Sequence, residues 1–67
     1  MRILQAISKE KKLQLIIEHD EKVGFYLLVY PLGSNKSSAD HLCDTLENAF
    51  FEANERYGVG RKDWIEF

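Results

Sequence analysis

The sequence predicts a two-layer α+β domain, in which an antiparallel meander of three or four strands packs on one helix in the C-terminal half of the chain. Strand-like segments at residues 2–8, 13–19 and 23–30 follow one another, and short polar stretches separate them. A shorter segment at 39–43 offers a fourth strand. The one helical pattern comes last, at residues 46–57.

The second of these segments alternates as a half-buried strand does. Leu13, Leu15 and Ile17 share one face, and Ile16 is an apolar exception on the opposite, polar face. Asp20, Glu21 and Lys22, together with Gly24, predict a polar hairpin connection to the third segment.

The third segment is apolar on both faces, and this is its most informative property. Its side chains alternate between Phe25, Leu27 and Val29 on one side and Tyr26, Leu28 and Tyr30 on the other. One helix can cover one face of a small sheet. The second face therefore needs another cover, which can be the tail of the chain, a second copy or a partner.

The helix is marked at both ends and along one side. Asp44 or Thr45 can cap its start, and Asp44 with Glu47 resembles a capping box. Gly58 suits the position after its last turn. The apolar stripe consists of Leu46, Ala49, Phe50, Ala53 and Tyr57. Phe51 lies off the centre of that stripe, which is a second sign of uncovered apolar surface.

The tail, residues 59–67, is expected either to form a short strand or to fold back over the sheet. Its Trp64 and Phe67 can serve an interface or complete the core of this small domain, and both alternatives stay open. The residues we expect at an interaction surface are Tyr26, Leu28, Tyr30, Phe51 and Trp64.

Size and composition limit the classes of protein to consider. Residues 1–67 make one domain, whose small size leaves it marginally stable without help such as oligomerisation. The net charge of −2 gives no broad basic field, and no apolar run approaches the roughly 20 residues that cross a bilayer. Cys43 is the only cysteine, and with no signal peptide in the sequence we expect a cytoplasmic protein that has no membrane contact.

Catalytic or metal-binding chemistry is not predicted. His41 and Cys43 would lie on the same side of a strand, about 7 Å apart, but two ligands do not complete a zinc site. No third group or oxyanion hole accompanies them for nucleophilic catalysis. His19 lies at a charged hairpin tip, and hairpin tips commonly carry polar residues for solubility. We therefore expect no enzyme, no cofactor and no metal.

Three segments of the chain resemble the sheet-and-helix module of HicB-type antitoxins. They are Leu13-Gln-Leu-Ile-Ile-Glu-His-Asp20, Gly24-Phe-Tyr-Leu-Leu-Val-Tyr-Pro31 and Asp44-Thr-Leu-Glu-Asn-Ala49, within residues 13–57. The family's "PDLPGC" stretch is absent, and Pro31-Leu-Gly33 leads into a longer polar loop instead. The chain is also similar, over more of its length, to small uncharacterised bacterial proteins with an acidic-tryptophan tail. This second resemblance implies no known activity. Together, the two resemblances imply a bacterial accessory protein that works by contact.

The leading functional hypothesis is a non-enzymatic protein-interaction module that forms a homodimer through the Tyr26, Leu28 and Tyr30 face or through a free strand edge. One alternative is an antitoxin- or immunity-like binder of a partner protein. Another is weak binding of single-stranded RNA by Tyr26 and Tyr30, with phosphate contacts from Lys9, Lys11 and Lys12 or from Arg61 and Lys62. The acidic helix argues against nucleic acid as a partner.

Overall fold

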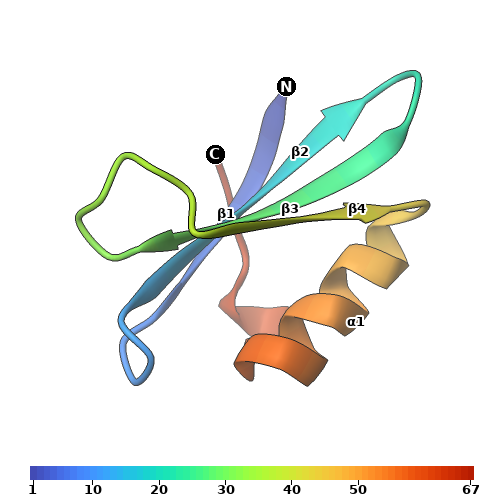
Figure 1. Ribbon diagram of the computed structural model, residues 1–67. Helices are drawn as coiled ribbons and strands as arrows, with labels where there is room; N and C mark the ends of the chain where they lie inside the picture. Colours follow the sequence, from blue (N-terminus) through green and yellow to red (C-terminus); the bar gives the residue numbers. More distant parts are fainter.

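In the computed structural model, which describes residues 1–67, a five-stranded antiparallel sheet has one helix along one side (Figure 1). The elements in chain order are β1 (Arg2–Ser8), β2 (Leu13–Asp20), β3 (Gly24–Pro31), β4 (Ala39–Cys43), α1 (Leu46–Tyr57), the 3-10 turn η1 (Arg61–Asp63) and β5 (Ile65–Glu66). The strand order across the sheet is β4-β3-β2-β1-β5. The predicted α+β meander on one C-terminal-half helix is therefore confirmed. The tail supplies a fifth strand at the edge of β1, which was one of its two expected courses.

The register of β2 against β3 places the predicted apolar sets on the face that meets the helix. Leu15 pairs with Val29, and Ile17 pairs with Leu27. All four side chains are fully buried. Because paired residues in an antiparallel sheet point to the same face, this register joins the apolar sides of the two strands into one surface.

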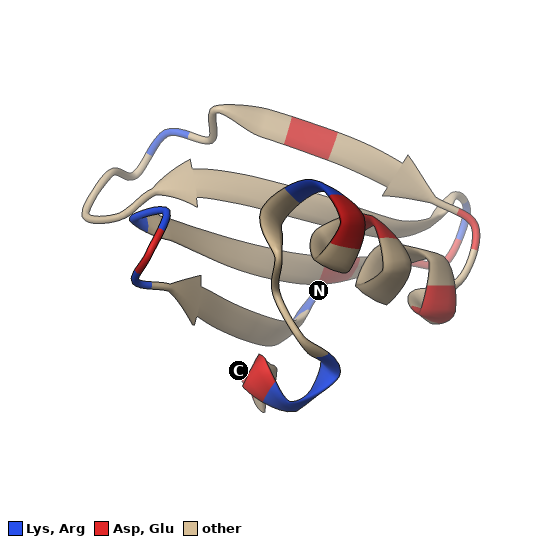
Figure 2. Cartoon of the chain, turned by 90° about the horizontal axis from the view of Figure 1, so that it is seen from below, with Lys and Arg blue, Asp and Glu red and all other residues tan.

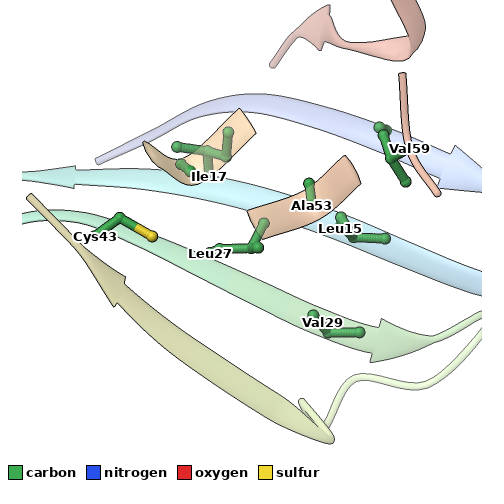
Figure 3. Packing of buried hydrophobic residues seen from close by; sticks show 9 residues of the cluster. Leu15, Ile17, Leu27, Val29, Cys43, Ala53 and Val59 are labelled. Carbon is green, nitrogen blue, oxygen red and sulfur yellow. The ribbon is translucent and has the colours of Figure 1, made fainter. Parts of the chain in front are cut away.

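The helix packs on this surface through its two small residues. Ala49 and Ala53 are completely buried, so the backbone of α1 comes close to the sheet. Figure 3 shows Ala53 above Leu15 and Leu27. The buried cluster consists of Ala6, Leu15, Ile17, Leu27, Val29, Cys43, Ala49, Ala53 and Val59. A close helix–sheet contact of this kind stabilises the domain by removing apolar surface from water, at about 25 cal/mol per Å².

The ends of the helix are capped by its own chain. The side chain of Thr45 accepts a hydrogen bond from the Asn48 N–H at 3.1 Å, so Thr45, rather than Asp44, is the N-cap. Glu47 consequently stands outside a capping box and pairs with Arg61 at 2.9 Å. Gly58 has a φ of 70° and donates its N–H to the Asn54 carbonyl, as predicted for the residue that ends this helix.

After the helix, the chain returns to the free edge of β1. Val59 is buried in the core, and Trp64 packs its ring on Phe50 with a centroid distance of 5.8 Å. The short strand β5 then pairs Ile65 with Gln5 in β1. The tail thus extends the sheet sideways and covers the end of the core on the helix side.

Gly24, at the start of β3, occupies a position that requires glycine. Its φ is +108°, which disfavours any other residue. A Cβ added there would lie 2.7 Å from the carbonyl oxygen of Cys43. The start of β3 and the end of β4 therefore meet through bare backbone.

Replacing Gly24 with alanine is expected to lower the free energy of unfolding by about 2 to 3 kcal/mol, because the Cβ strains the backbone and also collides with Cys43. Urea unfolding followed by circular dichroism measures this loss. Gly33→Ala is the matched control, since Gly33 also has a positive φ of +87° but an added Cβ there meets nothing within 4 Å. Equal losses in the two variants would contradict the importance of the backbone contact.

Candidate functional site

The sheet face opposite α1 has no helix over it, and we call it the open face (Figure 1). The strand register places three cross-strand rows of side chains there. The rows are Ile7, Gln14 and Tyr30; Gln5, Ile16, Leu28 and Asp40; and Arg2, Glu18, Tyr26 and Leu42. Three of the predicted interaction residues, Tyr26, Leu28 and Tyr30, therefore lie together on β3 on this face.

Arg2 spans the centre of the open face. Its Nε donates to Glu18 Oε2 at 3.1 Å, and its Nη2 donates to the Tyr30 hydroxyl at 3.3 Å. With Gln14, these side chains surround Ile16, which is only 3% exposed although no helix covers it. The apolar exception on β2 is thus sheltered by its polar neighbours. No pattern in the sequence indicates Arg2, because its position opposite Glu18 follows only from the pairing of β1 with β2.

Apolar side chains surround this sheltered centre. Ile7 is 51% exposed, Leu42 is 60% exposed and Ile65 is 62% exposed. Ile65 belongs to the same face, because β5 places it opposite Gln5. The tyrosines and Leu28 between them are half-buried. The open face therefore combines a partly covered apolar centre with an exposed apolar rim.

The other two predicted interaction residues lie elsewhere. Phe51 is 62% exposed on α1, in the helical layer of the molecule. Trp64 is half-buried against Phe50 and packs on the protein's own core, which matches the second of its two expected roles. The five residues thus divide into an open-face group, one exposed helical aromatic and one core residue.

A groove of about 360 Å³ lies where β4 ends and α1 begins. It is lined by Leu42, Cys43, Asp44, Asn48, Phe51 and Glu52. Its apolar walls are the exposed side chains of Leu42 and Phe51, and its polar walls include two carboxylates. Phe51 off the helical stripe was the one sequence signal for this groove, because the position of β4 beside the helix depends on the tertiary fold.

The pair His41 and Cys43 is engaged in local structure. His41 Nε2 and the Tyr57 hydroxyl form a hydrogen bond of 2.8 Å, which ties β4 to the end of α1. Cys43 is 4% exposed and contacts its own strand through the His41 carbonyl at 3.8 Å. Burial, followed by the negative charges of Glu52 and Asp44, raises the pKa of the Cys43 thiol. This environment favours the neutral thiol over the nucleophilic thiolate.

No group of three or more histidine, cysteine or acidic side chains is arranged to hold a metal ion. The one α-helix is too short and too polar to cross a bilayer. Comparisons of the chain with protein families, curated proteins and solved structures found no match. The resemblance to HicB-type antitoxins therefore stays a prediction.

Cys43 is expected to react slowly with iodoacetamide in the folded protein at pH 7, at least about tenfold more slowly than in urea, because the thiol is buried and its pKa is raised. Since the folded pKa is the higher one, the thiol's contribution to stability is present below the unfolded pKa and is lost as the pH rises through the folded pKa. Mass spectrometry of the alkylated protein gives the reaction rate in the folded state and the rate in urea. Equal rates would mean that the thiol is accessible in the native state.

Trp64→Phe is expected to leave the free energy of unfolding unchanged or to raise it by up to about 1 kcal/mol. Phenylalanine keeps a ring against Phe50, and the substitution removes the buried indole N–H, which has no acceptor within the chain. Trp64→Ala, which also removes the ring, is expected to cost about 3 kcal/mol. Thermal unfolding by circular dichroism compares the two. A loss above about 1 kcal/mol in Trp64→Phe would contradict this expectation.

Proposed function

We propose that this protein is a non-enzymatic interaction module that forms a homodimer by pairing the open faces of two copies. The observation that carries the proposal is that Tyr26, Leu28 and Tyr30 lie along β3 on a sheet face that has no covering layer. Tyrosine suits such an interface because it combines apolar area with a polar group. The exposed Ile7 and Ile65 at the rim extend the apolar surface that a second copy would cover.

Charge favours a second copy as the occupant of this face. The central charges, Arg2 and Glu18, already neutralise each other within one chain. Asp40 lies further out, on the edge strand β4. Two such faces can therefore meet around a twofold axis without placing uncompensated like charges at the centre. Single-stranded RNA finds less support here, because Arg2 is held by Glu18 and Tyr30.

The size of the molecule is compatible with this arrangement. A typical stable interface removes about 800 Å² from each partner. The whole chain exposes 4655 Å², so the dimer would cover about a sixth of it. A small domain gains stability from such an association, because folding and dimerisation are then linked. The proposal agrees with the expectation of a cytoplasmic bacterial protein that acts by contact.

The oligomeric state is the direct test. Sedimentation equilibrium over a range up to about 100 μM is expected to show a dimer, and Tyr30→Glu is expected to weaken it at least about 30-fold, since a charge buried at an interface costs about 2 kcal/mol or more. Phe51→Glu is the matched control. It also replaces an aromatic side chain with glutamate, but Phe51 lies on α1, away from the open face. It is expected to leave the dimer intact.

Ile7→Glu serves as a second variant if Tyr30→Glu fails to fold. Ile7 is 51% exposed in the single chain, so glutamate there is tolerated in the folded monomer, yet it would enter the dimer interface. A wild-type protein that stays monomeric throughout the concentration range would overturn the proposal. So would a dimer that both open-face variants leave unchanged.

A further inference from the structure

The strand β4 forms a free edge of the sheet. It pairs with β3 on one side, and no strand of the chain pairs with its other side. The backbone groups along that outer side can therefore pair with an added strand. At the opposite edge, the short β5 covers part of β1, so β4 is the longer of the two outermost strands.

The groove described above adjoins this edge. Its lining runs from Leu42 and Cys43 at the end of β4 to Phe51 on the helix. A strand added beside β4 would alternate its side chains between the open face and the helical layer. The side chains on the helical side would thus reach the groove, where the exposed ring of Phe51 can contact an apolar group.

The charges near the groove are predominantly negative. Asp44 and Glu52 line it, and Asp40 lies on β4 itself (Figure 2). Glu52 is paired with Arg56 at 2.7 Å, whereas no ion pair is formed by Asp40 or Asp44. The hairpin whose Gly24 packs on the end of β4 adds Asp20, Glu21 and Lys22, with a net charge of −1. This surface is therefore complementary to a basic partner.

We propose that the β4 edge and the adjacent groove bind an extended, lysine- or arginine-bearing segment of a partner protein as an added strand, with an apolar side chain of that segment in the groove. The proposal concerns a partner different from that of the homodimer, and its surface shares only the β4 residues Asp40 and Leu42 with the open face. A second copy is disfavoured here, because its own β4 would bring Asp40 and Asp44 against the same negative surface. Basic residues in the partner would instead meet these carboxylates.

A fluorescein-labelled octapeptide of alternating lysine and valine is a suitable probe, and fluorescence anisotropy measures its binding. Phe51→Ala is expected to weaken binding about tenfold by removing an apolar wall of the groove. Asp44→Asn is expected to weaken it about threefold and to reduce its salt dependence. Ile7→Glu, on the open face, is the control and is expected to leave the affinity within about twofold.

Two altered peptides test the separate parts of the proposal. An octapeptide of alternating glutamate and valine is expected not to bind, and equal binding would overturn the charge complementarity. A lysine–valine peptide with every backbone nitrogen methylated has no N–H to donate along either edge, so its equal binding would overturn strand addition.

Amide chemical shifts locate the bound peptide on the protein. Shift changes are expected in β4 and in the first turns of α1. Shift changes found mainly at Tyr26 and Tyr30 would overturn the proposed location. The dimer and the peptide site can fail separately. A monomer that binds the peptide contradicts only the homodimer, and a dimer that ignores the peptide contradicts only this inference.

Discussion

The structure depends on the close approach of α1 to the sheet at Ala49 and Ala53. With larger residues at these positions, the helix would stand further from Leu15 and Leu27, and the core would lose its packing density. The contact also determines what remains outside. A single helix of this length occupies one side of the sheet, so the apolar residues on the other side of β3 have only their neighbours for shelter.

The two uncovered surfaces differ in the way they handle charge. On the open face, Arg2 and Glu18 compensate each other beside the tyrosines. Around the groove, Asp44 has no such partner in the chain, and its charge helps to raise the pKa of the Cys43 thiol. A surface that is neutral at its centre can meet its own copy, whereas an acidic one selects an unlike partner. The difference in charge thus separates the two proposed modes of contact.

The local patterns were sufficient for the fold class, because strand and helix periodicities report directly on which side chains share a face. They predicted the two sides of β3, the apolar stripe of α1 and its end at Gly58. They did not decide between Asp44 and Thr45 as the cap, since both side chains can perform it. The role of Arg2 and the groove beside Phe51 depend on which strands pair and where β4 meets the helix. These are long-range relations that no short window of sequence contains.

The asymmetry of the two sheet edges has a consequence for assembly. Endless lateral growth of a sheet requires that each newly joined chain offer a template as good as the one it occupied. Here β5 contributes only two residues, Ile65 and Glu66, at its edge. The far edge, where β5 covers only part of β1, therefore offers a shorter and interrupted template. Unequal edges of this kind disfavour repeated addition of copies into a fibre.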